Sequence, residues 1–353
     1  MKRIFCALLA LVTAIFASSC SQASTPVAAD EGSAKLLVHF LDVGQGDSIL
    51  LESDDEFVLI DGGERDCGDQ VLRYIEDRGA DELKYMIATH PHADHIGGLR
   101  PVVNGIEVEN FITKSADCDT YSWTKLLRAV ENNHVNTIEA QADDTYSFGS
   151  AELTVLAPLS VYPEDYNNAS IVVMVTCGSI RFLLTGDAGR ESEYEMLDRG
   201  EELSADVLKC GHHGSSDSTS DRFLKAVNPS FAVVSCGADN DYGHPHRETV
   251  QKLKTLGCPL LRTDETGTIT AYTDGTHLRF SAENADLSVY TYTVGDTKND
   301  TSALGYIGNK NSGYFHYSDC DGAQSMKEKN KVFFDNREDA VDAGYTPCPN
   351  CQP

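Results

Sequence analysis

The order of apolar and polar positions along the chain predicts alternating strands and helices. Short apolar runs bounded by turn-forming residues occur at 36–43, 47–53 and 56–63, and their length is typical of buried strands. Residues 69–79 then carry apolar side chains at helical spacing, and residues 84–88 return to a strand pattern. The first part of the chain therefore predicts a sheet with at least one helix packed on it.

The same alternation continues to residue 282. We predict further strands and helices from the same two spacings, the strands at 110–113, 152–158, 170–178, 180–187, 205–211, 231–237 and 259–263 and the helices at 95–103, 122–133, 189–199, 219–227 and 247–256. Residues 267–282 have the pattern of a closing hairpin with its turn at Asp274 and Gly275. These elements predict an α/β fold in which two sheets form a sandwich flanked by helices.

The two ends of the chain do not fit this pattern. Lys2 and Arg3 precede a short apolar run, which is typical of a signal peptide. The small residues before Cys20 resemble a bacterial lipobox, which implies a lipid on Cys20 and an extracellular, membrane-anchored protein. Plain secretion and a retained anchor are the alternatives. We expect no transmembrane helix in the mature chain, and we divide it into a signal peptide of the lipoprotein type (1–19), a tether (20–35), a main domain (36–283), a polar linker (284–312) and a C-terminal module (313–353).

Charge and cysteine content narrow the possible partners. The net charge is −27, and such a field repels nucleic acid, although solubility alone explains an acidic exported protein. With this charge, DNA stays open as a partner only if specific motifs point to it.

Cys67 and Cys118 both fall in polar loops, and in an oxidising compartment a disulfide between them is one possibility.

Residues 89–98, THPHADHIGG, place three histidines and an aspartate within six positions. Alternate residues of an extended segment face the same way, so His90 and His92 are expected to share one metal ion. Asp94 and His95 open the next helix and point toward a second ion. Nitrogen and carboxylate ligands suit zinc, manganese or iron.

Other predicted strands also end in possible ligands. Asp61 follows the third strand, Asp187 ends the run RFLLTGD, and His212 and His213 follow the run ending in KCG. Asp187 is a candidate bridge between two ions. A solvated loop explains any one of these positions, but not the recurrence of Asp or His at four strand ends.

Together these motifs resemble the metallo-β-lactamase fold, an αββα sandwich. The finer resemblance is to the soluble hydrolase domain of the ComEC DNA-uptake family, through FLDVGQGDS (40–48), LIDGG (59–63), THPHADHIGG, NNASIV (167–172), RFLLTGD (181–187), KCGHHGS (209–215) and YGHPH (242–246). It spans roughly residues 36–281 and implies a metal-dependent hydrolase with two divalent ions, zinc or manganese.

Carried over by position, the resemblance assigns His90 and His92 to one ion. Asp94, His95 and His212 then bind the other ion, and Asp187 bridges. The wider fold places a third His on the first ion, where this chain has Asn167 and Asn168.

The remaining polar residues of these motifs receive supporting roles. Asp61 is expected to orient the ligands through hydrogen bonds, and Asn168 to support them in the same way. Asp94 is expected to orient the attacking water. His213 is expected to contact substrate or a ligand, and His244 and His246 to steady phosphate charge or protonate a leaving oxygen. A rigid Pro-containing loop is the alternative for His244 and His246.

The tail carries a second set of ligands. His316, Cys320, Cys348 and Cys351 have zinc spacing, and the short segment has too little apolar content for a core without a metal. A Cys348–Cys351 disulfide is the alternative. The segment resembles the Ada zinc-binding module, but His316 stands where that family has a Cys, so its thiol chemistry is not carried over. Structural or cell-surface docking is one expectation for it, and nucleic-acid contact the other.

The sequence favours an exported metal-dependent hydrolase, a phosphodiesterase or nuclease acting on DNA. A hydrolase of small esters, lactams or phosphocholine-type cell-wall substituents is the alternative, since one fold supports several chemistries. A third possibility is a surface binding protein with a residual metal site.

Overall fold

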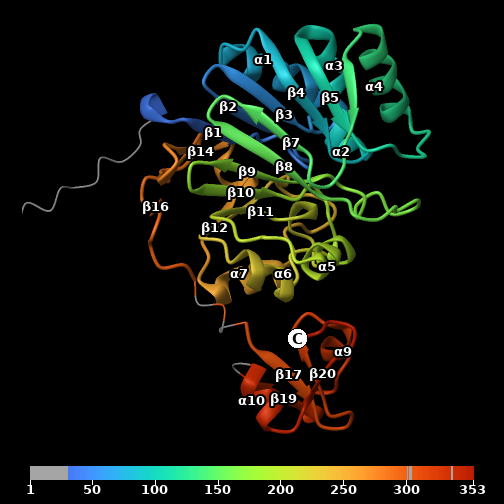
Figure 1. Ribbon diagram of the computed structural model, residues 1–353, viewed down its shortest axis with the longest axis vertical. Helices are drawn as coiled ribbons and strands as arrows, with labels where there is room; N and C mark the ends of the chain where they lie inside the picture. The colour runs from blue at the N-terminus through green and yellow to red at the C-terminus, as the bar shows by residue number, and fades with distance from the viewer. Residues whose placement is uncertain (1–30, 300, 302–303, 335–336) are drawn as a thin grey trace, which may run out of the picture.

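The structure is a computed structural model that describes residues 31–299, 301, 304–334 and 337–353 (Figure 1). The predicted signal peptide and Cys20 lie outside the described residues. Within the described ranges, none of the helices has the length and apolar character needed to cross a membrane.

The first sheet has nine strands in the order β16-β15-β14-β1-β2-β3-β4-β5-β6. Helices α1 (Gly68–Asp77), α3 (Leu99–Gly105) and α4 (Tyr121–Asn132) pack on its outer face through one buried apolar cluster. The strands are β1 (Leu36–Phe40), β2 (Ile49–Ser53), β3 (Glu56–Ile60), β4 (Glu82–Ala88), β5 (Glu107–Thr113), β6 (Asn136–Glu139), β14 (Ile269–Thr273), β15 (His277–Ala282) and β16 (Thr291–Thr293).

The second sheet has seven strands in the order β13-β12-β11-β10-β9-β8-β7. Helices α5 (Arg190–Arg199), α6 (Asp221–Val227) and α7 (Arg247–Leu256) cover its outer face. The strands are β7 (Thr145–Phe148), β8 (Ala151–Ala157), β9 (Val172–Cys177), β10 (Ile180–Leu184), β11 (Val207–Lys209), β12 (Phe231–Val234) and β13 (Leu260–Arg262).

The two sheets face each other across the largest apolar cluster of the described residues. All five residues of β1 are buried, and so are Phe182 of β10 and Phe280 of β15. Sheet strands that are apolar on both faces need cover on both faces, and here the opposite sheet and the helices supply it. The αββα sandwich predicted from the sequence is confirmed.

The direction of the strands determines which edge of the sandwich carries the candidate metal ligands. Strands β3, β4, β5 and β6 run parallel in the first sheet, and β10, β11, β12 and β13 run parallel in the second. The carboxyl ends of parallel strands lie at one edge of a sheet, where ligands of open α/β sheets are usually bound. The predicted metal ligands follow β4, β10 and β11 at this edge.

The C-terminal module is a small sheet in the order β19-β17-β18-β20, below α6 and α7 in Figure 1. Its elements are β17 (Tyr306–Asn309), β18 (Tyr314–Tyr317), α9 (Asp321–Gln324), β19 (Lys331–Phe334), α10 (Arg337–Asp342) and β20 (Thr346–Pro347). Two strands, β16 and β17, fall within the predicted linker, 284–312. β16 pairs with β15, and β17 pairs with β18 and β19, because distant partners order segments whose own composition is polar.

Candidate metal centre

The first group of ligands follows β4. Nε2 of His90 lies 2.9 Å from Nδ1 of His92, and 3.8 Å from Oδ2 of Asp187, which follows β10. Ligand atoms of these three residues all lie within 4.8 Å of one another. Burial, followed by the charge on His95, lowers the pKa of His90 well below its usual range, so this ring stays neutral and offers a lone pair.

The second group of ligands surrounds the other oxygen of Asp187. Oδ1 of Asp187 lies 3.2 Å from Nε2 of His95 and 3.6 Å from Nε2 of His213. Oδ2 of Asp94, from α2 (Ala93–Ile96), lies 3.3 Å from the same nitrogen of His213. Asp187 thus presents one oxygen to each group, and the residues meet from separate strand ends as the sequence predicts.

The chemistry of the second group fits a cation. Nε2 of His95, Nε2 of His213 and Oδ1 of Asp187 are buried without hydrogen-bond partners. Burial opposes a charge on His95, but Asp187 and Asp61 outweigh it and raise the pKa of His95 well above its usual range. The carboxylates therefore favour positive charge here, which a divalent ion among these atoms supplies.

The Nδ1 atoms of His95 and His213, on the side of each ring away from Asp187, have polar partners of their own. Nδ1 of His95 lies 2.8 Å from Oδ2 of Asp61, and Nδ1 of His213 lies 3.0 Å from the carbonyl oxygen of Ser235. Metal-binding histidines usually donate their second N–H to a carboxylate or carbonyl in this way. Both rings are therefore held with Nε2 toward Asp187.

Asp61 holds the loop after β4 that carries ligands of both groups, and it is not a member of either group. Its carboxylate accepts hydrogen bonds from the backbone N–H of Thr89 at 2.9 Å and from Oγ1 of Thr89 at 2.6 Å, besides its contact with His95. Asn168 also lies outside both groups. Its Oδ1 accepts from the backbone N–H groups of Gly189 and Ser192, both at 3.1 Å, so it supports the loop that follows Asp187.

The order of His212 and His213 differs from the prediction. His213 is buried within the second group, whereas the side chain of His212 is 27% exposed and its Nε2 lies 3.9 Å from Oδ2 of Asp187. Both residues have positive φ, 49° and 52°. The backbone reverses here, so being the first residue after β11 does not make His212 the inner side chain.

The predicted pair His244 and His246 divides between two roles. His244 lines a cavity of about 220 Å³ together with Gln45, His92, Asp94, Asp187, His212, His213 and Tyr242. His246 is outside that lining, and its ring joins two loops. Its Nδ1 accepts from the backbone N–H of Ser216, in the loop after His213, at 2.9 Å, and its Nε2 lies 3.2 Å from the carbonyl oxygen of Tyr242 in its own loop. His246 therefore holds the loop, and His244 faces the cavity.

Sequence reasoning missed Asp47, whose carboxylate belongs to the second group, with an oxygen within 4.8 Å of ligand atoms of His95, Asp187 and His213. Nζ of Lys209 lies 2.9 Å from Oδ2 of Asp47, and Oδ1 of Asp47 lies 3.3 Å from Nδ1 of His213. Burial opposes ionisation of Asp47, but Lys209 and His213 outweigh it and lower the pKa of Asp47 to about 2. The lysine that ends the short, buried strand β11 was the available signal, since buried charges are normally paired.

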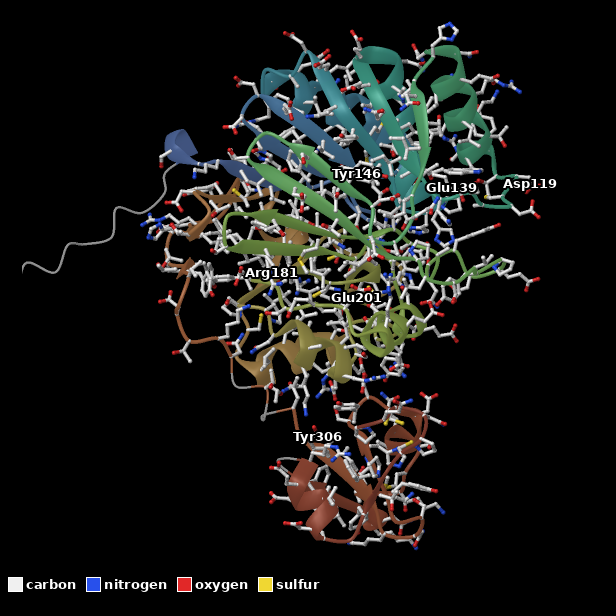
Figure 2. The ribbon with its side chains drawn as sticks, viewed as in Figure 1. Asp119, Glu139, Tyr146, Arg181, Glu201 and Tyr306 are labelled. Carbon is white, nitrogen blue, oxygen red and sulfur yellow. The ribbon has the colours of Figure 1, made fainter. Side chains whose placement is uncertain are left out.

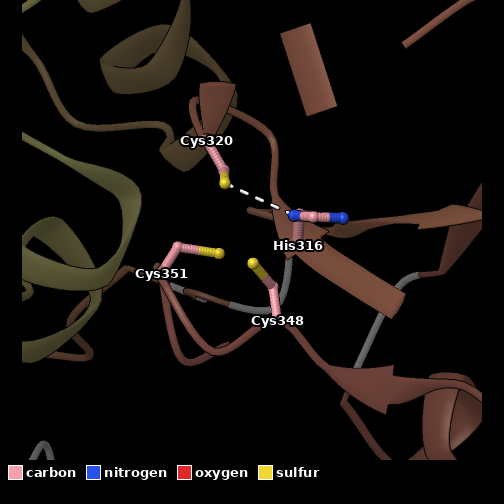
Figure 3. A group of neighbouring side chains, drawn as sticks. All are labelled: His316, Cys320, Cys348 and Cys351. Carbon is pink, nitrogen blue, oxygen red and sulfur yellow. Dashed lines mark hydrogen bonds between the residues drawn. The ribbon is translucent and has the colours of Figure 1, made fainter. Parts of the chain in front are cut away.

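The four tail residues also converge (Figure 3). Ligand atoms of His316, Cys320, Cys348 and Cys351 lie within 4.8 Å of one another, and all four residues are buried. The cysteines are free thiols, so the alternative Cys348–Cys351 disulfide is not formed. Three thiols and one imidazole at this spacing fit a structural zinc ion.

The possible disulfide in the main domain is also not formed. Cys67 and Cys118 are both free. Sγ of Cys67 donates to the carbonyl oxygen of Val43 at 3.2 Å, and Sγ of Cys118 lies 3.4 Å from Oγ1 of Thr120. Each thiol thus has a local partner of its own.

Two protein-family models match the chain. The model described as "Metallo-beta-lactamase superfamily" matches residues 41–238, and the model described as "Metal binding domain of Ada" matches residues 295–353. Both resemblances predicted from the sequence motifs are confirmed. The second match begins inside the predicted linker, in agreement with the position of β17.

Curated relatives also match the chain. ComE operon protein 3 of Bacillus subtilis (strain 168) is 31% identical over 250 residues, covering 66% of this chain and 32% of the relative. Competence protein ComA of Neisseria gonorrhoeae is 28% identical over 246 residues, covering 69% and 33%. The chain thus spans about a third of the length of these relatives.

The metallo-beta-lactamase fold protein YhfI from Bacillus subtilis aligns with a TM-score of 0.46 and 16% identity, over 66% of this chain and 98% of YhfI.

Proposed function

The chain belongs to the metallo-beta-lactamase superfamily, and from the geometry of its metal centre we propose that it is a metal-dependent phosphodiesterase, a nuclease acting on DNA. The observation that carries this proposal is the position of Asp187. Its Oδ2 lies 3.8 Å from Nε2 of His90, and its Oδ1 lies 3.2 Å from Nε2 of His95. One carboxylate that faces both groups suits a pair of ions, the arrangement many phosphodiesterases use.

Two divalent ions, zinc or manganese, when bound by these groups would activate water and offset the charge of a phosphoryl group. His90, His92 and Asp187 would hold the first ion, and Asp94, His95, His213 and Asp187 the second. The chain's own residues supply orientation. Asp94 lines the cavity, and its side chain is 27% exposed, so its carboxylate can accept a hydrogen bond from an attacking water.

His244 faces the same cavity from the opposite loop. Its Nδ1 lies 3.4 Å from Nε2 of Gln45, which fixes the ring. Burial and then the charges on His213, His212 and His246 lower the pKa of His244 to about 4. A neutral imidazole at this position can hydrogen-bond a leaving-group oxygen without adding another charge.

The names of the relatives favour DNA as the substrate. The relatives are called ComE operon protein 3 in Bacillus subtilis, competence protein ComA in Neisseria gonorrhoeae and recombination protein 2 in Haemophilus influenzae. The net charge of −27 opposes a polyanion, so DNA cleavage is expected to need divalent cations beyond those of the site.

A second candidate is hydrolysis of small esters, lactams or phosphocholine-type substituents. The acidic charge and the small cavity, about 220 Å³, favour it. One assay separates the candidates, with single-stranded DNA, double-stranded DNA, bis-p-nitrophenyl phosphate and nitrocefin as substrates and Mn²⁺ or Zn²⁺ as metal. Cleavage of nitrocefin or an ester without cleavage of either DNA or the model diester would overturn the phosphodiesterase proposal.

We also propose that the protein acts outside the cell, anchored at the outer face of the membrane by a lipid on Cys20. The sequence around Cys20 is the support. Mass spectrometry of the membrane-bound native protein tests it, and a mature N-terminus other than Cys20 contradicts it.

A further inference from the structure

The zinc module contacts the main domain through buried charged groups. Asp319, which immediately precedes the zinc ligand Cys320, is buried, and its Oδ2 accepts from the backbone N–H of Asp221 at 3.1 Å. In return, the carboxylate of Asp221 accepts from the backbone N–H and hydroxyl of Ser318, at 3.1 and 2.5 Å. Reciprocal bonds between buried groups fix the start of the module against α6.

A second contact of the same interface is aromatic. Nζ of Lys225, from α6, lies 3.9 Å from the centre of the Tyr306 ring. Tyr306 lies on the side of the module that faces the sandwich (Figure 2). A cation over an aromatic face adds attraction that does not depend on the Asp319 network.

Arg190 joins this interface to the metal centre. It lies three residues after the bridging Asp187 and begins α5, where the helix dipole disfavours a cation. Two carboxylates of the module lie near its guanidinium, Asp319 at 3.8 Å and Asp321 at 3.7 Å. These two residues flank Cys320 in the sequence, so a metal ion bound by Cys320 would hold the backbone on both sides of it in place.

Arg190 also lines a cavity that both parts of the chain enclose. This cavity, about 500 Å³, is lined by Asp187 and His212 from the metal centre and by Asp321 from the module. Among its lining residues are five carboxylates, Asp165, Asp187, Glu191, Asp217 and Asp321, but no Lys and no Arg other than Arg190. Nε of Arg190 is buried without a hydrogen-bond partner.

We propose that Arg190 couples the zinc site of the tail to the catalytic cavity. A metal ion on Cys320 fixes Asp319 and Asp321, which hold the guanidinium in the cavity wall, where it offsets the surrounding carboxylates and admits an anionic substrate. The part played by the substrate rests on the proposed phosphodiesterase function. The coupling itself does not, because it links two parts of one chain.

The coupling is tested first on the zinc ion. Binding couplings are reciprocal, so an Arg190 that is held by the metal-bound module must also stabilise it. In the full-length protein, Arg190→Gln should speed the release of tail zinc to a chromogenic chelator roughly threefold to tenfold, the range for one or two partly buried ion pairs. The Cys348→Ser variant lacks one ligand of the tail site, so the phase of zinc release that is missing from this variant is the one that belongs to the tail.

Matched variants separate coupling from a general loss of stability. Arg199→Gln changes an ion-paired arginine at the other end of α5, 2.9 Å from Glu201, and should leave zinc release unchanged. Asp321→Asn alters a side chain that is 96% exposed and should speed release less than Arg190→Gln does. Arg190→Lys keeps the charge and should restore part of the effect.

The second readout is the KM for bis-p-nitrophenyl phosphate. Arg190→Gln should raise KM several-fold with a smaller change in kcat. Introducing Asp319→Asn into the Arg190→Gln variant should raise KM less than Asp319→Asn does in the wild-type protein. Unchanged zinc release in Arg190→Gln, with or without a changed KM, overturns the coupling. A wild-type protein that cleaves no phosphodiester overturns the proposed function, while the zinc experiment still decides the coupling.

Discussion

The two metal sites of this chain are built in opposite ways. The catalytic ligands come from several strand ends of a sandwich whose core stands without them, and their outer atoms are fixed by Asp61, Asp47 and Ser235. The tail ligands all lie between His316 and Cys351, and its three cysteines are themselves members of the module's small buried cluster. The fold builds the first site, whereas we expect bound metal to supply much of the stability of the C-terminal module.

The largest expected effect follows from removing the bridge. Asp187→Asn weakens the ligand that faces both groups, so both catalytic ions should be lost and hydrolysis should fall by more than about 10²-fold, since changes behind the ligands alone cost ~10–100-fold. The fold should persist because the sandwich core is separate. Circular dichroism with metal analysis checks this. An unfolded variant would contradict the view that the sandwich folds without its catalytic metal.

The tail should behave in the reverse manner. Chelation of zinc or Cys348→Ser should leave the sandwich folded but open residues 306–353 to protease, because the module's cluster is centred on its ligands. Limited proteolysis of the full chain with mass spectrometry measures this. Cys118→Ser, a half-buried thiol of the main domain, is the control. A module equally resistant in EDTA would show that its apolar contacts suffice.

Much of the sandwich could be predicted because its strands are locally distinctive. The runs that became β1, β9 and β10 are almost wholly buried, and continuous apolar stretches of that length predict strands. β6 and β7 were missed because they end their sheets and are mostly polar and exposed. Edge strands depend on a neighbour for their hydrogen bonds, and that neighbour is invisible in the local pattern.

The candidate site was predictable where ligands cluster in sequence and less so where partners are distant. His90, His92, Asp94 and His95 identify themselves by spacing, and Asp187 by ending a buried strand. The pairing of Asp47 with Lys209 joins segments far apart in the chain. The inward position of His213 depends on positive φ at both His212 and His213, a backbone conformation that a histidine can adopt but that its presence does not predict.

A smaller effect should separate the two adjacent histidines. His213→Ala removes a buried member of the second group, so about one equivalent of catalytic metal and roughly 10²-fold of activity should be lost. His212→Ala changes a partly exposed ring outside that group and should cost about tenfold or less with both ions retained. Metal analysis beside kinetics decides it, and the opposite order would restore His212 as the ligand.

The smallest expected effect concerns how far the catalytic site is formed before metal arrives. The pKa of Asp47 is lowered to about 2 in the folded chain, against 3.8 for an ordinary aspartate. The unfolded chain therefore binds more protons between these values, so the contribution of Asp47 is complete above pH 4 and is lost as pH falls toward 2. It amounts to about 2 kcal/mol. In metal-free protein, Asp47→Asn should lower the free energy of unfolding at pH 7 and flatten its fall in acid, while Asp55→Asn, which changes an exposed aspartate in the turn between β2 and β3, should change neither. Denaturant unfolding of the sandwich from pH 2 to 7 measures both. If Asp47→Asn left the acid limb unchanged, the pair with Lys209 would form only around bound metal, and the catalytic site would resemble the tail more closely than its strand-borne geometry indicates.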